Sequence, residues 1–479
     1  MTYYLKLTII SCVILITSGC ATLPDTQFYT SKYRNQAAQF ESARGAVSTK
    51  RSAAIVAELK RTAGDLDILD KQIALEQEVV GLPLVVGNKV TLLIDGPATY
   101  KAMFEAIKSA KDNINMESFI FEDDEIGQQF ADLLIERQSL GVQVNLMYDS
   151  AGNITTNTNF FDPLIKAGVH VLEFNPINPL KGKKSWEPNH RDHRKLLIID
   201  GQTAFLGGIN ISNVYSNGSM SGGSFASGSD NKRKKVTSKK VADKDANKDK
   251  SGWRDTDVKL EGPIVAQFQT LFIGSWNKQK GHPLAPKAYY PMVAAQGKDI
   301  VRAIGSTPDD PFSLMYLTLI SAITNSEKQV YITNAYFVPD PQLIKSLLDA
   351  ASRGVDVRLI LPQHTDSSAA YYAGRSYFSE LLKGGIKIYE RRDALLHAKT
   401  AIVDGIWVSV GSSNLDWRSA LDNDEVNAVI LGREFSQEME AAYLNDIKAS
   451  DEITLTAWQD RSILLKIKEM GARLLGRFL

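Results

Sequence analysis

The sequence predicts an α/β protein made of two pseudo-symmetric halves, each a mainly parallel mixed sheet flanked by helices. Two observations lead to this prediction. Strand-like segments alternate with helical segments of about ten to fifteen residues, and the same order of elements, carrying the same polar motif, occurs twice. At 479 residues the chain is long enough for two ordinary domains or one large duplicated domain, and the repeat favours the second.

The composition is that of a globular protein without a strong charge bias. The chain is 44% hydrophobic and 23% charged, and its 55 Lys and Arg residues balance its 55 Asp and Glu residues. The overall charge therefore gives no reason to expect nucleic acid as a partner, although a chain of zero net charge can still contain a locally basic cleft. Only two cysteines occur, both within the first twenty residues. We expect no cysteine-based metal site in the main body, and no metal or cofactor.

The first twenty residues predict a secretion signal. The stretch MTYYLKLTIISCVILITSGC has one lysine, an apolar run of about a dozen residues and then small residues before Cys20. Its end resembles a bacterial lipobox, with Thr17 in place of the usual leucine, and predicts lipidation of Cys20. An uncleaved N-terminal anchor is the alternative. Both interpretations place the protein in the bacterial cell envelope, facing the periplasm and anchored in the inner or outer membrane.

A polar leader precedes the repeated body. Residues 21–82 have a helical period, and residues 83–295 form the predicted first half. The expected strands and helices of this half lie at 89–95, 97–111, 113–121, 126–141, 142–149 and 160–174. Because strands alternate with helices, the strands are expected to run mainly parallel.

Residues 296–450 form the predicted second half and repeat this order at 329–338, 341–362 and 378–390. Three pairs of motif residues have the same spacing of 204 positions (397 − 193): His193 and His397, Gly207 and Gly411, Asn210 and Asn414. Further on, Asp255 aligns with Glu425 at a spacing of only 170 (425 − 255). The first half therefore contains an insertion, which we place at 216–251.

The insertion and the C-terminal tail differ in composition from the repeated body. Residues 216–251 are rich in Gly and Ser, then in Lys and Asp, and predict a disordered segment. Residues 451–479 form the predicted amphipathic tail. Within it, residues 461–479 predict a basic amphipathic helix, with apolar positions at Ile463, Leu464, Ile467, Leu474, Leu475 and Phe478 among Lys466, Lys468, Arg473 and Arg477. Such a helix either lies in an anionic membrane interface or packs its apolar face on the body. The sequence leaves both open.

The repeated motif brings together residues suited to phosphoryl chemistry. His193 and Lys195 are two positions apart, which puts both side chains on one face of a strand. Asp200 and Gly201 then predict a hairpin turn, and the returning strand brings Asn210 beside the pair. The second copy offers His397, Lys399, the Asp404 turn and Asn414 in the same way.

Two histidines and two lysines without a metal fit phosphodiester transfer best. One neutral histidine attacks phosphorus, and the other, protonated, gives its proton to the leaving alkoxide. Lysine and amide groups hold the phosphoryl oxygens. Each histidine needs an acceptor to orient it, and Asp255 and Glu425 occupy equivalent repeat positions.

These motifs resemble the phospholipase D superfamily, and most closely the single-signal, lipoprotein-like bacterial cardiolipin synthases. The resemblance covers about residues 83–450 and includes ESFIFEDDEIG, NHRDHRKLLIIDG, YFVPD, LLHAKTAIVDG and GSSNLDWRS. It implies two halves that share one active site. The implied catalytic residues are His193, Lys195, Asp200, His397, Lys399 and Asp404. The implied phosphate-binding residues are Asn210, Ser412 and Asn414. Gly208 departs from the pattern, because the motif often has a serine there, as at Ser412.

The resemblance implies a phosphatidyltransferase that makes cardiolipin from phosphatidylglycerol and a second phospholipid, such as phosphatidylethanolamine, through a phosphohistidine on His193. A phospholipase D that releases phosphatidic acid is the first alternative, and a nuclease or a non-catalytic membrane scaffold ranks lower. The expected partners are phospholipid substrates and a membrane surface. An accessory protein is a further candidate, because some members of this subgroup work with one.

Overall fold

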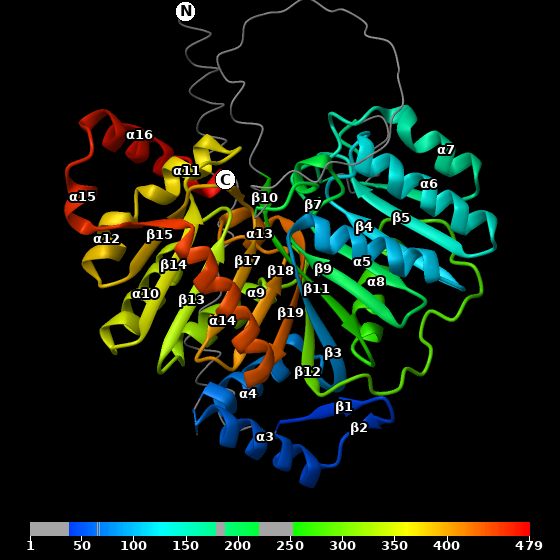
Figure 1. The fold of residues 1–479 in the computed structure, drawn as a ribbon, viewed down its shortest axis with the longest axis horizontal. Helices are drawn as coiled ribbons and strands as arrows, with labels where there is room; N and C mark the ends of the chain where they lie inside the picture. The colour runs from blue at the N-terminus through cyan, green and yellow to red at the C-terminus, as the bar shows by residue number, and fades with distance from the viewer. Residues whose placement is uncertain (1–37, 65, 67, 179–186, 220–251) are drawn as a thin grey trace, which may run out of the picture.

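The computed structural model describes residues 38–64, 66, 68–178, 187–219 and 252–479, in two α/β halves that lie side by side above a small N-terminal unit (Figure 1). Residues 1–20, for which a signal peptide and lipidation of Cys20 are predicted, and most of the predicted insertion lie outside these residues. No helix within the described ranges is long and apolar enough to span a bilayer.

The first half follows the predicted order. Its elements are β3 (Leu84–Ile94), α5 (Asp95–Ser109), β4 (Asn113–Ser118), α6 (Glu125–Ser139), β5 (Gln143–Asp149), α7 (Asp162–Lys166), β6 (His170–Phe174), β8 (Lys195–Ile199), β9 (Thr203–Gly207), β11 (Thr256–Glu261) and α8 (Val265–Lys278). Strands β4, β5 and β6 are parallel. Strands β8, β9, β11 and β3 continue the sheet in antiparallel order, because the histidine motif forms a hairpin.

The second half repeats this arrangement. It contains β12 (Asp299–Ser306), α9 (Leu314–Thr324), β13 (Gln329–Asn334), α10 (Pro341–Ser352), β14 (Asp356–Pro362), α11 (Ser368–Arg375), α12 (Phe378–Lys383), β15 (Lys387–Arg391), β17 (Lys399–Val403), β18 (Trp407–Gly411), β19 (Asn423–Leu431) and α14 (Arg433–Lys448). Strands β13, β14 and β15 are parallel, and β17, β18, β19 and β12 are antiparallel. Both predicted mixed sheets are present. The expectation of mainly parallel strands is not met, because only β4–β6 and β13–β15 are parallel and the motif hairpins add antiparallel strands to each sheet.

The two halves join through both backbone and core. Strand β3 pairs with β12, so one continuous sheet runs through the molecule. One hydrophobic cluster contains Val258 and Phe268 of the first half together with Val408 and Val426 of the second, all fully buried. Because removing apolar surface from water is favourable, this shared cluster stabilises the contact between the halves.

The leader is part of the body rather than a detached spacer. It forms β1 (Phe40–Ser42), β2 (Gly45–Ala46), α3 (Thr49–Ala63) and α4 (Ile68–Val80). Leu69 and Ile73 of α4 pack in the same core as Ile320 of α9. Glu76 is fully buried and pairs with Arg302 at 3.0 Å, and the Trp407 indole N–H donates to it at 2.8 Å.

This ion pair predicts a test of how the leader stabilises the fold. Glu76→Ala leaves Arg302 buried and charged without its partner, and should lower the free energy of unfolding by about 3–5 kcal/mol. Asp349→Ala is the matched control, because it breaks the exposed Lys345–Asp349 pair of α10 and should cost less than about 0.5 kcal/mol. Denaturant unfolding measures both values. Equal costs would contradict a stabilising role for the leader.

Candidate active site

The two motif hairpins place the histidine–lysine pairs at one edge of the sheet. Lys195 begins β8 opposite Ser118, the last residue of β4, and Lys399 begins β17 opposite Asn334, the last residue of β13. The carboxyl ends of the parallel strands and the starts of both motif strands therefore lie at the same edge. This edge is where the two halves meet.

Short strands cross between the halves and hold each histidine. Strand β7 (Arg191–Asp192) pairs with β19, and β10 (Trp253–Arg254) pairs with β16 (Leu395–Leu396). As a result, the His193 backbone N–H donates to the Asp424 carbonyl at 2.9 Å, and that of His397 donates to the Arg254 carbonyl at 2.8 Å. Each motif histidine is thus fixed by backbone from the opposite half.

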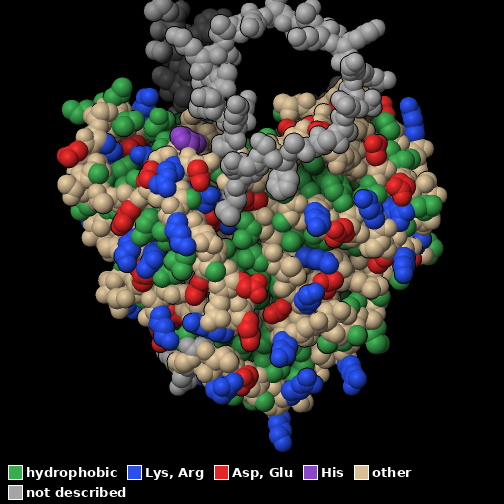
Figure 2. All heavy atoms as spheres, in the orientation of Figure 1, with side chains coloured by type: hydrophobic (Ala, Val, Ile, Leu, Met, Phe, Trp, Pro, Cys, Tyr) green, Lys and Arg blue, Asp and Glu red, His purple; other side chains and the backbone are tan. Residues whose placement is uncertain are grey.

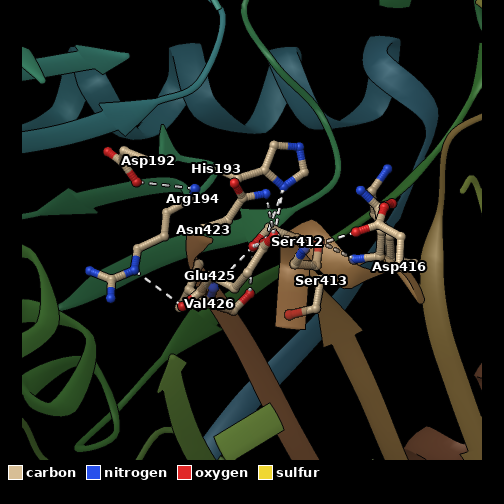
Figure 3. Close-up of polar contacts among 12 residues, drawn as sticks. Asp192, His193, Arg194, Ser412, Ser413, Asp416, Asn423, Glu425 and Val426 are labelled. Atoms are coloured by element: carbon tan, nitrogen blue, oxygen red, sulfur yellow. Dashed lines mark hydrogen bonds and ion pairs between the residues drawn. The ribbon is translucent and has the colours of Figure 1, made fainter. Parts of the chain in front are cut away.

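The side-chain partners also come from the opposite half. His193 Nδ1 lies 3.1 Å from both carboxylate oxygens of Glu425 (Figure 3), and His397 Nδ1 lies 2.7 Å from Asp255 Oδ2. An Nδ1–H that donates to a carboxylate leaves Nε2 as the basic, nucleophilic nitrogen. The structure therefore brings the two predicted orienting carboxylates to the two histidines, one in each direction across the interface.

Burial and charge set the protonation of these groups. Burial lowers the pKa of His193 to about 4 against the opposing effect of Glu425, and it also lowers the pKa of His397. Burial alone would raise the pKa of Glu425, but the His193 charge and hydrogen bond outweigh it and hold the pKa at about 2. The free site therefore contains neutral imidazoles beside ionised carboxylates.

Both lysines lie within the same buried site. Burial lowers the pKa of Lys195 to about 7 and that of Lys399 to about 8, and the Lys399 charge lowers the pKa of Lys195 further. The Lys195 ammonium donates to the His193 carbonyl at 2.5 Å, and Lys399 makes the equivalent bond to His397. A phosphate that binds between them would restore their charge, because an anion favours the ammonium form.

The second-half carboxylate has a complete set of donors. The hydroxyl of Ser412 donates to Glu425 Oε2 at 2.5 Å (Figure 3), and that of Ser419 donates to Oε1 at 2.7 Å. Ser412 was predicted to bind phosphate; in the structure its hydroxyl donates to Glu425, and the phosphate role stays a prediction. Ser419, in the short helix that follows the motif, was not predicted at all.

The first half has different residues around its carboxylate, Asp255. Gly208 and Tyr215 occupy the repeat positions of Ser412 and Ser419. A Cβ on Gly208 would lie 2.2 Å from Asp255 Oδ1, so the carboxylate fills the space that a serine would need. Tyr215 places its hydroxyl 3.3 Å from His397 Nδ1. The departure at Gly208 therefore follows from the position of Asp255.

The two asparagines differ in their availability. Asn210 accepts from the Ile120 N–H and donates to the Tyr215 hydroxyl, both at 3.1 Å, so its amide supports the loops around His397. The Asn414 side-chain oxygen is buried without a partner within the described residues. Asn414 also lines a small cavity together with Lys399. Of the two, Asn414 is the better placed for a phosphoryl group.

Asp200 and Asp404 lie at the far end of the motif strands. The Asp200 carboxylate accepts the backbone N–H groups of residues 111–113 at 2.8–3.0 Å, and that of Asp404 accepts those of residues 327–329 at 2.7–3.2 Å. Both have positive φ, near 52°, in the hairpin turn. Each lies five positions after its lysine, about 16 Å along the strand. This position corrects their assignment as catalytic: they form the turns and anchor β4 and β13.

A buried polar network beside His193 was not predicted. It joins Glu117, Asp192, Arg194, His190 and Asp424. The His190 ring lies 2.8 Å from Asp424, and Arg194 lies 3.8 Å from Glu117. Burial raises the pKa of Glu117 well above its ordinary range. The sequence shows the segments NHRDHR and LDNDEVN, but their spatial pairing depends on the interface between the halves.

Aromatic rings enclose both histidines. Three ring centroids lie near that of His397, at 5.2 Å for Trp253, 5.8 Å for Tyr215 and 6.1 Å for Tyr336. The Phe119 ring centroid lies 5.0 Å from that of His193.

Among the described residues, no group of three or more His, Cys, Asp and Glu side chains is arranged to hold a metal ion.

Fold and site together define a phospholipase D-type enzyme, in which two repeated halves each supply one histidine and one lysine to a single site. A family model described as "Cardiolipin synthase, PLD-like domain" matches residues 103–219 in the first half and 319–447 in the second. The chain belongs to this family, and it is a phosphatidyltransferase that acts on phospholipids.

Similar proteins cover most of the chain. The cardiolipin synthase of Listeria monocytogenes serotype 4a (strain HCC23) is 34% identical over 402 residues, which are 83% of this chain and 77% of the relative. That of Geobacillus thermodenitrificans (strain NG80-2) is 31% identical over 402 residues, 83% of this chain and 74% of the relative. The crystal structure of phosphatidylserine synthase from Haemophilus influenzae Rd KW20 has a TM-score of 0.59 at 14% identity, and covers 84% of this chain and 99% of its own. This last match supports the fold.

The contacts of Ser412 predict a positioning role that can be separated from phosphate binding. Ser412→Ala removes a donor that favours ionised Glu425, so the pKa of Glu425 should rise. The acid limb of the kcat profile should then move to higher pH, with kcat lowered about tenfold and KM little changed. Ser413→Ala is the matched control, because Ser413 donates to Asn427 instead. A rise in KM with an unmoved pH profile would indicate direct phosphate binding.

Proposed function

We propose that the enzyme synthesises cardiolipin by transferring a phosphatidyl group from one phospholipid to phosphatidylglycerol. The observation that carries this proposal is the pair of buried imidazoles, each oriented by a carboxylate from the opposite half. The cardiolipin synthases of Listeria and Geobacillus, similar along four-fifths of the chain, support the choice of product. The donor is phosphatidylglycerol or another phospholipid such as phosphatidylethanolamine.

In the first step, His193 Nε2 attacks the phosphorus of the donor. An N–P bond forms, the bond from phosphorus to the head-group oxygen breaks, and the leaving alkoxide takes a proton from His397 Nε2. Since both imidazoles are mainly neutral in the free site, His397 must gain this proton when the anionic donor binds. Asp255, held 2.7 Å from His397, stabilises the imidazolium that results.

In the second step, His397 takes the proton from the hydroxyl of phosphatidylglycerol. The alkoxide oxygen attacks the phosphohistidine, the N–P bond breaks and His193 is regenerated. Lys195, Lys399 and Asn414 hold the phosphoryl oxygens in both steps, where their charge and N–H groups offset the developing negative charge. Water in place of the alcohol would release phosphatidic acid, so acceptor access decides between transfer and hydrolysis.

Product analysis tests this proposal. The purified protein is incubated with phosphatidylglycerol vesicles, with and without phosphatidylethanolamine, and lipids are identified by mass spectrometry. We expect cardiolipin with released glycerol or ethanolamine, which also identifies the donor. Phosphatidic acid alone would indicate a hydrolase. His193→Ala and His397→Ala should each lower turnover by at least about 1000-fold. Appreciable turnover by His397→Ala would contradict the two-histidine mechanism.

We also propose that the protein is a lipoprotein of the bacterial envelope, anchored through acylated Cys20 with its body facing the periplasm. The apolar run and the TSGC ending support this assignment. Mass spectrometry of the N-terminal peptide from membranes should find a chain that begins at Cys20 and carries lipid. An unmodified peptide that retains residues 1–19 would instead indicate an uncleaved anchor.

A further inference from the structure

The C-terminal helix α16 (Ile463–Leu474) turns its apolar side away from the protein. Ile463, Ile467, Met470 and Leu474 follow the spacing i, i+4, i+7 and i+11, which puts them on one helical face. All four are strongly exposed, from 54% at Ile467 to 81% at Leu474. The short helix η3 (Gly476–Phe478) adds Phe478, also exposed. Figure 2 shows hydrophobic side chains at the corner that α16 forms.

The opposite face of α16 packs on the body through small and polar residues. Glu469 is buried and pairs with Arg461 at 2.8 Å. Ala472 and Leu479 pack against a cluster formed by Val338 and α11. At about 100° per residue, positions 469 and 472 lie roughly opposite 463, 467, 470 and 474. The sequence left open whether this tail packs on the body or lies in a membrane interface. Packing on the body applies only to the face that carries the small and polar residues.

Basic side chains fix this orientation and flank the apolar face. Lys468 lies over the Tyr372 ring at 5.6 Å, Arg473 over the Tyr377 ring at 4.2 Å, and Arg477 over the Trp417 ring at 5.6 Å. Each contact holds the helix to the body on its inner side. All three side chains remain exposed, as does Lys466. An apolar stripe flanked by cations is the arrangement of helices that lie in an anionic membrane interface.

The exposed face adjoins the active site. Its supporting cluster includes Tyr336, whose ring faces His397. Arg477 packs on Trp417 of α13 (Trp417–Leu421), the helix that supplies Ser419 to Glu425. Helix α11 follows the carboxyl end of β14, so α16 lies at the same edge of the sheet as the two histidines (Figure 1).

We propose that the outer face of α16, with Phe478, docks on the anionic surface of a lipid bilayer and holds the active-site edge against it. The charge of the flanking residues selects anionic lipid, and the apolar side chains enter the acyl boundary. This inference adds a membrane-binding surface to the proposed function and rests on it for the source of the substrate. The docking itself does not require turnover, so the two can be tested separately.

A fluorescent label at the helix tests the proposal on the full chain. The sequence has only Cys12 and Cys20, and both are replaced with serine so that the dye reacts at the introduced cysteine alone. The replacement of Cys20 also removes the proposed acylation site. Leu474→Cys is then labelled with a polarity-sensitive dye, and Leu140→Cys is the control. Leu140 is 64% exposed and precedes β5, at the amino ends of the parallel strands. Vesicles of phosphatidic acid and phosphatidylcholine present an anionic surface without the head-group alcohol that the proposed transfer releases.

We expect the label at position 474 to shift to the blue and to be shielded from a water-soluble quencher on these vesicles, and less on pure phosphatidylcholine. The label at 140 should not change. Shielding of the label at 474 without vesicles would overturn the proposal. If this shielding grows with protein concentration, a second copy of the chain covers the helix face. If it does not, the chain itself covers that face. Equal behaviour of the two labels on vesicles would also overturn it.

Charged substitutions give a second measurement. Ile467→Glu with Leu474→Glu should weaken binding to the anionic vesicles at least about tenfold, because two apolar groups are lost from the interface. Leu140→Glu with Met292→Glu is the matched control and should bind as the parent does. Turnover of monomeric short-chain phosphatidylglycerol should be unchanged by either pair. Unaltered vesicle binding by the α16 variant would overturn the proposal, whereas docking without any lipid product would contradict only the proposed function.

Discussion

Each half supplies the carboxylate that orients the histidine of the other half, and the site depends on this interaction. Neither half is complete: Glu425 orients the histidine of the first half, and Asp255 orients that of the second. All four side chains are buried, and a carboxylate or imidazolium buried alone is costly. The hydrophobic core between the halves offsets that cost and sets the distances. Stability and catalysis therefore depend on the same interface.

The duplication has not preserved two identical environments. Glu425 is longer than Asp255 and is met by two serine hydroxyls, whereas Asp255 lies against Gly208 and leaves Tyr215 beside the histidine. The polar network of Glu117, Asp192 and Arg194 also accompanies only His193, since Thr333 and Leu396 occupy the repeat positions of Glu117 and Asp192. Unequal surroundings suit a reaction in which one imidazole carries phosphorus and the other carries protons.

Much of the fold followed from local sequence signals. The alternation of strands and helices and the constant spacing between motif copies predicted both sheets and the hairpins. The repeat also predicted Asp255 and Glu425 as the two residues that orient the histidines. The missed features depend on contacts between distant segments. Ser419 and Tyr215 lie in short helices whose position the motif does not determine, and His190 meets Asp424 only across the interface. Asp200 and Asp404 were predicted as turn residues from the sequence and as catalytic residues from the resemblance, and their position in the structure agrees with the turn.

Location of the site at the carboxyl edge of both sheets has a consequence for acceptor choice. In the proposed mechanism, transfer and hydrolysis share every step up to the phosphohistidine and differ only in whether a lipid hydroxyl or water reaches it. Aromatic rings around His397 already limit the space open to solvent, and α16 adjoins them through Tyr336. An enzyme docked by that helix would meet its second substrate from the bilayer and keep bulk water from the same edge. Excluding water also strengthens the lysine contacts with phosphate, because both charges then interact in a medium of low dielectric constant.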